Sequence, residues 1–541
     1  MNAVAAHHDV VILGGGLAGL TLALQLRRRM PDLDVLVLER RTHPHPEAAH
    51  KVGESSVEIQ AHYLSQVLGL QDYLERRQLR KFGFRFFWSD GAPDLTDVTE
   101  LGASTFLPTQ SYQLDRGMLE NDLAQMVQAA GVQHRDGALV RDFTLGRKGE
   151  RHRVRFVHGG GAHEATADWL VDASGRAGLV KRRLDLAQPN DHAAHAVWFR
   201  IDRRIDVAAW TRDAEWLARC DPPNRWLSTN HLVGAGYWVW LIPLASGSHS
   251  VGIVADPALH PLEGMNSFDK AMDWLRVHQP QLYADLDARR GSLQDFAFFK
   301  RFSYGCRKVY SGSDRWALTG EAGLFLDPFY SPGGDFIAVS NGFVTELVAQ
   351  DRAKAPVGML APLYERIYFS LYEAMLPIYV GQYPLFASAE VMPLKVLWDY
   401  TFYWGVMCQL FFQGKLVEVQ TMARLQDALA WSHRMNVAVQ DFLRAWGALD
   451  GGARPRRMLD QAGLDWFAEL NRGLTDRLDE AAFAARLQAN LQLLHQLAAQ
   501  LVERALRQHP GLPADALRAV MAQRPAAPAA RNLLFPNLSP A

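Results

Sequence analysis

The sequence contains few cysteines. Its three, Cys220, Cys306 and Cys408, are far apart in a chain of 541 residues and have no metal-ligand spacing. This pattern argues against a disulfide framework and fits a reducing compartment. The N-terminus also lacks the shape of a signal peptide, because it enters an apolar run at once. We therefore expect a cytoplasmic protein without structural disulfides.

An excess of either charge is also absent. The chain has 57 Lys and Arg against 58 Asp and Glu, and its basic clusters are short. A sequence without a broad positive field is not expected to bind nucleic acid or anionic lipid. The most membrane-like stretch, residues 396–412, is slightly short for a span, is rich in aromatics and contains Asp399. We expect a buried or pocket-lining helix there and no transmembrane segment.

Metal-binding motifs and the nucleophile motif of hydrolases are both absent from the sequence. The 19 histidines show no HExxH or other metal-ligand spacing, and no Gly-x-Ser-x-Gly occurs. The first absence predicts that there is no metal site, and the second leaves an α/β-hydrolase without support. The chain is 48% hydrophobic, an ordinary globular composition, and is long enough for two or three domains with sizeable cores.

Hydrophobic patterning changes along the chain. Residues 9–39 predict a strand, an amphipathic helix and a second strand, and residues 80–260 alternate short β-rich runs with turns. Beyond about residue 340 the pattern is helical, and residues 479–508 predict one long helix or a hairpin of two. This succession predicts a sheet-containing second domain interleaved with the first.

The strongest local signal is a glycine-rich turn near the N-terminus. Gly14, Gly16 and Gly19 follow an apolar strand and open a helix, and Glu39 ends the next strand. That context is the dinucleotide-binding fingerprint, in which glycines let the backbone approach a pyrophosphate and the helix N-terminus favours its negative charge. We expect Glu39 to accept hydrogen bonds from ribose hydroxyls.

Three further segments resemble the para-hydroxybenzoate-hydroxylase-like flavoproteins and favour FAD over NAD. "YQLDRGMLENDL" places Arg116 just before a helix, where those enzymes have a flavin-contacting arginine. "WLVDASGR", residues 169–176, resembles the strand that closes their second flavin-side turn. "RWALTGEAGLFLDP" resembles their strand with a Gly-Asp pair against the ribityl chain. Here that pair is Gly320-Glu321, so the acidic side chain is one methylene longer.

Two motifs narrow the resemblance to the flavin-dependent halogenases, the tryptophan-halogenase-like family. "YWVWLIP" carries Trp238 and Trp240 at alternate strand positions, which alone usually indicates core packing. Followed by Ile-Pro, the string matches the WxWxIP signature of that family, in which these residues are thought to keep substrate away from the flavin. "KVGESSVEI", residues 51–59, resembles the family's Gly-Glu-Ser segment after the second strand. The resemblance covers roughly residues 9–345.

The resemblance implies a catalytic lysine. In the family a lysine precedes a Gly-containing strand that ends in aromatics, and "KFGFRFFW" fits this pattern with Lys81. Hypohalous acid made at the flavin would travel to this lysine, whose nitrogen can hydrogen-bond the acid or form a haloamine. A dry environment would make the amine easier to deprotonate and more reactive. From residue type alone, Lys81 could equally be a surface lysine at the start of a strand.

The stretch "FLDPFYSPGGDF" resembles the family's halide-binding loop. There the family carries Asp/Glu-Pro followed by a Ser-Ser-Gly or Ser-Thr-Gly turn, whose N–H groups lie near the flavin and hold halide. Ser331 and Gly333 match this turn, whereas Pro332 takes the middle position and donates no N–H. Gly333 and Gly334 would then supply two N–H groups as a shifted nest.

Tyr330 precedes this turn, where the tryptophan-specific branch of the family has a glutamate. A free-tryptophan substrate is therefore not expected. Tyr330 could assist a phenol with its hydroxyl, or it could simply form part of the wall. Asp335, a few residues further on, is another polar candidate, with a solvated or capping role as the alternative. Asp399, in the aromatic run at residues 396–412, is a possible base that deprotonates or orients a phenol.

The resemblance implies an α/β (α+β) fold with a Rossmann-like domain that binds FAD. We expect that domain within residues 1–345, interleaved with a β-rich substrate domain at about 80–110 and 190–300. A helical C-terminal domain, 346–522, would cover the active site, and residues 523–541 would form a flexible tail.

We therefore expect a two-component halogenase that uses FADH2 from a separate flavin reductase, O2, and chloride or bromide. Its substrate would be an electron-rich aromatic, phenol- or pyrrole-like, lipophilic or carrier-bound, as in pigment and polyketide-type pathways. Because only one dinucleotide fingerprint is present, no NAD(P)H site is expected. Two alternatives stay open: a single-component FAD monooxygenase that hydroxylates or epoxidises a similar substrate, and a non-catalytic flavin-binding assembly partner.

Overall fold

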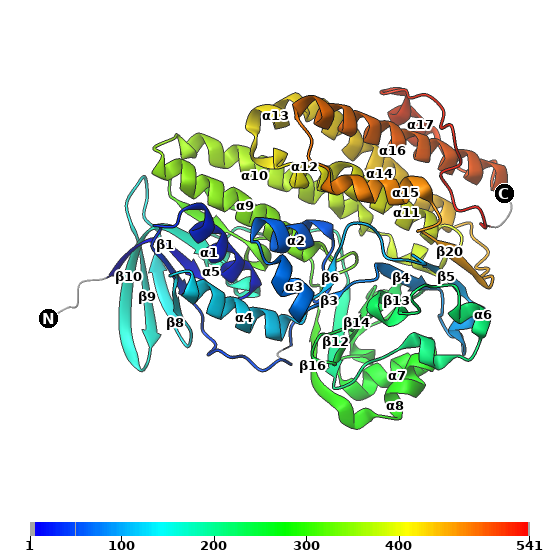
Figure 1. Ribbon diagram of the computed structural model, residues 1–541, viewed down its shortest axis with the longest axis horizontal. Helices are drawn as coiled ribbons and strands as arrows, with labels where there is room; N and C mark the ends of the chain where they lie inside the picture. Colours follow the sequence, from blue (N-terminus) through cyan, green and yellow to red (C-terminus); the bar gives the residue numbers. More distant parts are fainter. Residues whose placement is uncertain (1–5, 49, 539–541) are drawn as a thin grey trace. The chain divides into compact units, whose positions relative to one another are not determined.

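The computed structural model describes residues 6–48 and 50–538, and these divide into two units. Each unit draws on three separate stretches of the sequence, which the colours of Figure 1 follow along the chain. The first unit contains residues 6–77, 114–191 and 303–372, and the second contains 78–113, 192–302 and 373–538. The mixed α/β class that the sequence indicates is confirmed.

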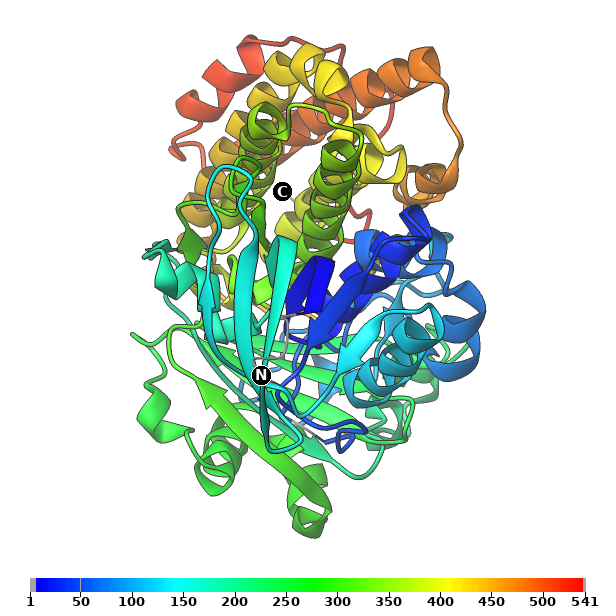
Figure 2. The same ribbon diagram turned by 90° about the vertical axis from the view of Figure 1, so that its left-hand side faces the viewer.

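The first unit is built on a sheet with a parallel centre. Its main path runs β18-β19-β10-β1-β2-β7, and β8 and β9 extend the sheet from β10. Figure 2 shows β9 and β10 (cyan) beside β1 (dark blue). All of β2 is buried, as expected of a parallel strand covered on both faces. The strands are β1 (Ala6–Leu13), β2 (Val35–Leu38), β7 (Gln133–Arg135), β8 (Leu139–Thr144), β9 (His152–His158), β10 (Gly161–Asp172), β18 (Tyr310–Ser311) and β19 (Trp316–Leu318).

Three helices of the first unit pack together against this sheet. Helix α1 (Leu17–Arg29) contacts both α4 (Arg116–Ala129) and α9 (Pro332–Arg352). Strands β1, β2 and β10 end in register, with Leu13 paired to Leu38 and to Asp172. Because parallel strands bring their carboxyl ends to one edge, the turn after β1 lies at the edge where doubly wound sheets bind ligands.

The second unit contains a mostly antiparallel sheet with two different faces. Its strand order is β16-β12-β15-β14-β13-β4-β5-β20. One face packs against α7 (Phe268–His278) and α8 (Pro280–Asp287), which lie together in Figure 1. The strands are β4 (Phe84–Phe87), β5 (Thr99–Gly102), β12 (His195–Ile201), β13 (Thr229–Gly234), β14 (Tyr237–Pro243), β15 (His249–Ala255), β16 (Leu293–Phe299) and β20 (Arg457–Asp460).

Alternation along the strands assigns residues to the two faces. On β14, Tyr237, Val239 and Leu241 belong to the hydrophobic core between the sheet and helices α7 and α8. Because side chains alternate along a strand, Trp238 and Trp240 lie on the opposite face of the sheet. We call this opposite face the aromatic face. It also carries Phe84 and Phe86 of β4, His231 of β13 and Trp198 of β12.

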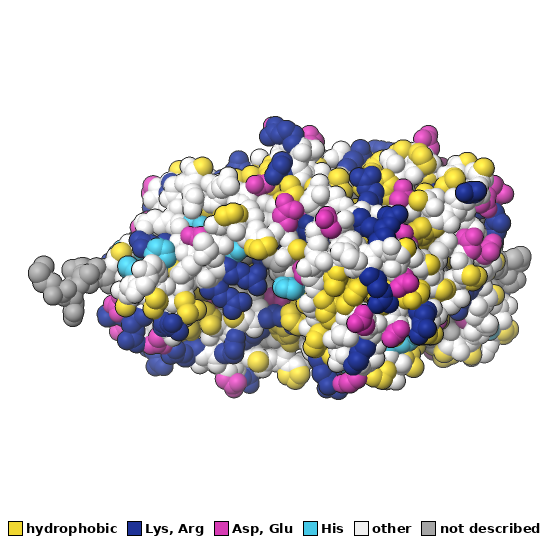
Figure 3. Space-filling model, turned by 90° about the horizontal axis from the view of Figure 1, so that it is seen from below, with side chains coloured by type: hydrophobic (Ala, Val, Ile, Leu, Met, Phe, Trp, Pro, Cys, Tyr) yellow, Lys and Arg dark blue, Asp and Glu magenta, His cyan; other side chains and the backbone are white. Residues whose placement is uncertain are grey.

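Most helices of the second unit follow residue 373. Residues 396–412 are helical throughout, as α11 (Met392–Phe402), a π-helical turn (Tyr403–Cys408) and α12 (Gln409–Phe412), and almost all of them are buried. Helix α16 (Glu480–Gln508) is a single long helix rather than a hairpin. Within the described ranges, no helix has the length and apolar character needed to cross a membrane. Basic and acidic side chains are interspersed on the face seen in Figure 3.

Two expected boundaries need correction. The expected domain break at 345–346 falls inside helix α9, so the chain does not divide there. The expected flexible tail is packed over 523–538: Leu533 and Phe535 are buried, and the Leu533 N–H donates to the Gln500 side chain at 2.8 Å. Apolar residues in this Ala- and Pro-rich segment cover α16, which composition alone did not reveal. Residues 539–541 lie outside the described residues.

Candidate functional site

The glycine-rich turn after β1 forms a cradle whose three glycines are needed for different reasons. Gly14 has a φ of +112°, and a Cβ there would lie 2.4 Å from the carbonyl oxygen of Ala173. A Cβ on Gly19 would lie 1.9 Å from the carbonyl oxygen of Gly14, so this glycine allows α1 to approach β1. A Cβ on Gly16 would meet nothing within 4 Å. The open space lies where α1 begins, and these residues fit a dinucleotide pyrophosphate.

Glu39 lies beside this turn and is buried. One carboxylate oxygen accepts a hydrogen bond from the N–H of Gly15 at 2.7 Å, and the other accepts from the N–H of Arg41 at 2.8 Å. These bonds fix the carboxylate at the end of β2, and a carboxylate retains capacity for further donors. The role of Glu39 in binding ribose stays a prediction that this geometry permits.

Arg116 begins helix α4 and belongs to a charged cluster. Its guanidinium donates to the carbonyl of Val52 at 2.8 Å and pairs with Glu120, which also pairs with Lys51. Burial raises the pKa of Glu120, but the charges of Arg116 and Lys51 outweigh burial and hold that pKa at about 2. The cluster ties the Val52–Gly53 segment to α4 and leaves one net positive charge, which suits an anionic ligand.

The Gly320-Glu321 pair adopts a turn whose acidic side chain already has a partner. Gly320 has a φ of +60°, and the Glu321 carboxylate lies 2.9 Å from Nε of Arg176. Arg176 belongs to the "DASGR" string, and its guanidinium also lies 5.2 Å from the ring centroid of Phe325. The resemblance predicts a contact of Glu321 with a ribityl chain but not this ion pair, because Arg176 and Glu321 are 145 positions apart in the sequence.

Residues 325–336 form the turn before helix α9. Tyr330 and Ser331 have φ values of +66° and +55°, in the left-handed region that costs about 1–2 kcal/mol for a residue with a side chain. Asp327 stabilises the turn, since its carboxylate accepts from the N–H of Phe329 at 2.7 Å. Two successive strained residues held by surrounding contacts are typical of functional sites.

Pro332 takes the first position of helix α9, where its missing N–H has no cost because the first N–H groups of a helix lack intrahelical acceptors. Gly333 and Gly334 follow as donors, and within the part of the chain that the structure describes neither N–H has an acceptor. A Cβ on Gly334 would lie 2.0 Å from the Gln60 side chain. Asp335 is buried and accepts from the Gln60 N–H at 2.9 Å, so it supports this packing.

Lys81 precedes β4 in the second unit and is buried, with 4% of its surface exposed. Its Nζ lies 3.4 Å from the ring centroid of Phe84, a close cation–π contact. Its backbone N–H donates to the carbonyl of Ser111 at 2.9 Å, which fixes the start of the side chain. The alternative of a surface lysine is therefore wrong for this position, and the catalytic role of Lys81 stays a prediction.

The two tryptophans of the WxWxIP string are fixed on the aromatic face by hydrogen bonds. The indole N–H of Trp238 donates to the Tyr383 hydroxyl at 3.1 Å, and that of Trp240 donates to the Ser250 hydroxyl at 3.1 Å. Gly252 lies opposite Trp240 on β15, and a Cβ there would lie 2.1 Å from the indole. Ser250 and Gly252 therefore shape the sheet around one indole, whereas Tyr383 comes from the helical part of the unit.

His231, which no sequence motif marks, lies among these aromatic residues. Its ring stacks on Phe86 with centroids 4.5 Å apart and lies 5.4 Å from Trp238. A lone histidine in an apolar strand is no signal by itself. Only the pairing of β13 with β4 and β14 brings it near Lys81. Burial lowers the pKa of His231, and the charge of Lys81 lowers it further.

Asp399 has a structural partner inside the helices. Its carboxylate lies 2.8 Å from Nζ of Lys395 and accepts from the Gln440 amide at 2.6 Å. Burial lowers the pKa of Lys395, while the negative charge of Asp399 opposes that shift. The three residues bridge α11 and α14 (Gln426–Gly447), so we do not assign Asp399 as a base.

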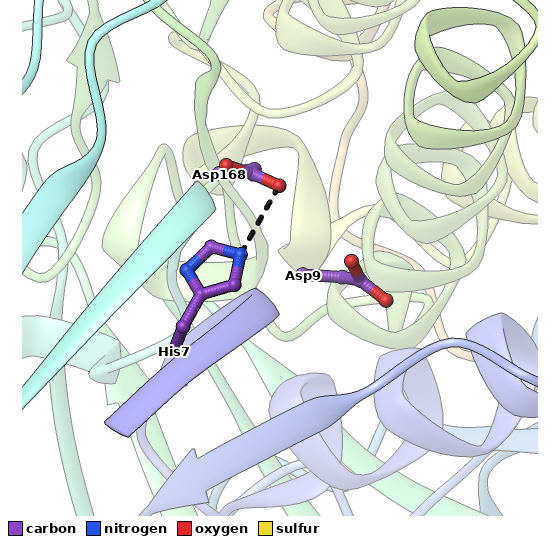
Figure 4. Close-up of side chains that lie close together, drawn as sticks. All are labelled: His7, Asp9 and Asp168. Carbon is purple, nitrogen blue, oxygen red and sulfur yellow. Dashed lines mark ion pairs between the residues drawn. The ribbon is translucent and has the colours of Figure 1, made fainter. Parts of the chain in front are cut away.

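One group of side chains in the described residues has the composition of a metal site. His7 and Asp9 on β1 lie beside Asp168 on β10, as Figure 4 shows. Nε2 of His7 is 3.5 Å from Asp168, which Arg151 also approaches at 3.6 Å, and Asp9 accepts from the N–H of Asp34. These surface carboxylates already have partners, so we assign no metal site to them.

The chain matches known proteins over a stretch that includes both the glycine cradle and strands β4, β13 and β14 of the aromatic face. A family model described as "FAD binding domain" matches residues 7–246. The flavin-dependent halogenase chlA of Dictyostelium discoideum is 30% identical over 393 residues, covering 63% of this chain and 60% of that protein. The 1H-pyrrole-2-carbonyl-(peptidyl-carrier protein) chlorinase of Pseudomonas fluorescens is 25% identical over 353 residues, covering 60% of this chain and 72% of that protein.

Solved structures share the fold. A flavoprotein/dehydrogenase from Cytophaga hutchinsonii has a TM-score of 0.57 at 20% identity and covers 72% of this chain and 91% of its own. The halogenase PltM in complex with phloroglucinol and FAD has a TM-score of 0.60 at 15% identity and covers 95% of this chain and 96% of its own.

The cradle and the matching family model define a protein with an FAD-binding domain. In sequence the chain is similar to flavin-dependent halogenases over about three fifths of its length. It spans 60% of the length of the Dictyostelium relative.

Proposed function

We propose that this protein is a two-component, FADH2-dependent halogenase that acts on an electron-rich aromatic substrate. The observation that carries the proposal is Lys81, buried on an aromatic sheet face that also holds the two tryptophans of the WxWxIP string. Burying a lysine has a high free-energy cost, because its ammonium must be removed from water. The similarity to flavin-dependent halogenases supports the same assignment.

The residues that would hold FAD lie in the first unit. The cradle suits the pyrophosphate, Glu39 suits the ribose, and Arg116 with the Gly320-Glu321 turn suits the rest of the cofactor. When bound in reduced form, the cofactor supplies hypohalous acid from O2 and chloride or bromide. The cradle glycines are Gly14, Gly16 and Gly19.

The turn before α9 would bind the halide. The N–H groups of Gly333 and Gly334 are adjacent donors at the positive end of a helix, and Pro332 does not interrupt them because it occupies the first helical position. Ser331 and Tyr330 hold the left-handed turn that presents these donors. Tyr330 has a polar tip suited to a phenolic substrate.

Lys81 would deliver the halogen to the substrate. Its nitrogen hydrogen-bonds hypohalous acid or takes up the halogen as a haloamine. A ring carbon then bonds to the halogen as the oxygen–halogen or nitrogen–halogen bond breaks. When the oxygen–halogen bond breaks, the displaced hydroxide leaves as water after gaining a proton. In the haloamine route, water is released as the nitrogen–halogen bond forms, and the amine takes up a proton when that bond breaks. In both routes the ring carbon loses its proton to solvent. Trp238 and Trp240, each held by a hydrogen bond from its indole N–H, would exclude substrate from other positions.

The substrate class follows from the aromatic environment and from relatives. Aromatic side chains around a charged nitrogen favour a flat, electron-rich ring. Two relatives are named as a chlorinase and a brominase of pyrrole-2-carbonyl groups on a peptidyl-carrier protein, so a carrier-bound pyrrole stands beside a free phenol as a substrate. A separate flavin reductase would supply FADH2.

The test supplies purified protein with FADH2 from an unrelated reductase, O2 and bromide or chloride, together with free phenols and carrier-bound pyrroles. Mass spectrometry should find halogenated product in the wild type and at least about a hundredfold less in Lys81→Ala, as removal of an essential catalytic group predicts. Retained FAD absorbance and melting temperature would show that the variant folds. Halide-independent hydroxylation would identify a monooxygenase, and FAD binding without any product would identify a non-catalytic partner.

A further inference from the structure

Three histidines of the first unit, His43, His45 and His134, form a histidine cluster beside the glycine cradle. The ring centroid of His43 lies 4.0 Å from that of His45 and 5.1 Å from that of His134. His43 and His45 belong to the segment that follows β2, whereas His134 lies on β7. A Cβ on Gly15 would lie 3.2 Å from Nε2 of His134. The histidine cluster therefore packs directly against the cradle.

The backbone that carries two of these rings is held by hydrogen bonds. The N–H of His43 donates to the carboxylate of Asp136 at 2.7 Å. The N–H of His45 donates to the Asn121 side chain at 2.7 Å, and the Asn121 amide donates back to the His45 carbonyl at 2.9 Å. Glu39 stands at the start of the same segment. The rings therefore cannot separate widely without breaking these bonds and loosening the chain next to Glu39.

The packing of the histidine cluster suits neutral rings. Both ring nitrogens of His43 and Nε2 of His134 are buried, and among the described residues none of these three atoms has a hydrogen-bond partner. A protonated imidazole carries an N–H on both nitrogens, so protonation of His43 would bury a cation whose two donors have no acceptor. Burying such a cation has a higher free-energy cost than burying the neutral ring.

The charges that face the cluster act in both directions. Burial is the main cause that lowers the pKa of each of the three histidines, and a positive charge on His43 would lower the pKa of His45 and His134 further. Carboxylates oppose these shifts, and an ammonium adds to the shifts of His43 and His45. These charged groups are Glu39 at the end of β2, Asp136 after β7, Glu120 on α4, and Lys51. Because the net direction is downward, the rings are neutral near pH 7 and take up protons in acid.

We propose that the histidine cluster makes retention of FAD depend on pH: its neutral rings hold the segment after β2 against the cradle, and their protonation separates them and releases the cofactor. Protons pass from solvent to imidazole nitrogens, and like charges at these separations repel one another. Opened rings bind protons at higher pH than packed ones, so the opened form gains on the closed form as the pH falls below the ordinary histidine pKa of about 6.5. The proposal concerns the FAD-binding unit and does not depend on the halogenase assignment.

Fluorescence titration with FAD tests the proposal at about pH 7.5 and about pH 5.5, on either side of the ordinary histidine pKa. We expect the dissociation constant of the wild type to rise at least about tenfold in acid, the equivalent of one pKa unit. In His43→Phe, which keeps a ring between the other two but cannot be charged, we expect a rise of less than about threefold. Equal rises in the two proteins would overturn the proposal. So would tighter binding by the wild type in acid, since it would show that a charged cluster attracts the cofactor phosphates.

Two further variants keep the titration decisive. His163→Phe removes an exposed histidine of β10 that lies outside the cluster, and we expect it to show the wild-type rise. A reduced rise in this control would contradict the assignment to the cluster. Thermal melts of the apoproteins at the higher pH identify a variant that does not fold. If His43→Phe does not fold, His134→Gln removes a titrating ring while leaving His43 and His45 in place, and a wild-type rise in this variant would overturn the proposal.

A measurement on the rings themselves tests the linkage without any reaction. In protein labelled with ¹³C at the histidine Cε1, the His43 signal is assigned by its loss in His43→Phe. Since protonation and FAD binding oppose each other in the proposal, each must weaken the other by the same factor. We therefore expect the His43 signal to titrate at a lower pH with FAD bound than in the apoprotein. An unchanged titration, or one that moves to higher pH with FAD, would refute the proposal.

Discussion

The cradle of the first unit and the aromatic face of the second differ in what they are made of. The cradle is built from backbone groups and from the absence of side chains at Gly14, Gly16 and Gly19. The aromatic face is built from large buried side chains around Lys81. Backbone donors and open space suit a large anionic cofactor, whereas a desolvated lysine among aromatic rings suits chemistry on a flat substrate. The comparison shows why one site has a contiguous sequence motif and the other is scattered along the chain.

The largest expected effect comes from a glycine of the cradle. We expect Gly19→Ala to abolish FAD binding and lower the melting temperature by several degrees, because its Cβ would lie 1.9 Å from the carbonyl oxygen of Gly14 and α1 would have to move off β1. Fluorescence titration with FAD and thermal melts of the apoprotein measure the two effects.

Gly16→Ala is the matched control for this prediction. Its added Cβ meets nothing within 4 Å in the protein, so the apoprotein should melt within about 1 °C of the wild type. FAD affinity should still fall, since the methyl group enters the space expected for the pyrophosphate. Equal destabilisation of the apoprotein by both substitutions would show that the two glycines do not have different roles.

An intermediate effect on stability and product yield is expected from substitutions beside the aromatic face. Tyr383→Phe leaves the buried indole N–H of Trp238 without its partner, at a cost of about 1–3 kcal/mol. We expect a lower melting temperature and a severalfold lower yield of halogenated product, because Trp238 lies 5.4 Å from His231. Ser250→Ala removes the partner of Trp240 and should lower the melting temperature with little change in yield. The reverse ranking of the two yields would place the reaction nearer Trp240.

The smallest effect is expected at the ion pair between Arg176 and Glu321. Arg176 and Glu321 are 26% and 30% exposed, so water screens their attraction. We expect Arg176→Ala to change the FAD dissociation constant by less than about fivefold, equivalent to about 1 kcal/mol. A larger loss, measured by the same FAD titration, would make Arg176 a ligand of the cofactor rather than a partner of Glu321.

Sequence patterns were most informative where a function needs neighbours in the chain. The strand-turn-helix at the N-terminus, the FAD-binding domain and the halogenase resemblance were all predicted from short strings. Lys81 was also singled out, although its burial was not predictable from residue type. His231, Tyr383 and the Arg176 partner of Glu321 were not found, because each depends on a contact between residues about 145 positions apart in the chain.

The cradle is encoded locally, in one short stretch of the sequence. Three glycines within six residues set the backbone between β1 and α1, and a local turn needs no distant partner to take its form. Tertiary structure alone decided the surroundings of Lys81. Strands β4, β13 and β14 bring Phe84, His231 and Trp238 together only after non-local pairing fixes their register and hence the face on which each side chain lies.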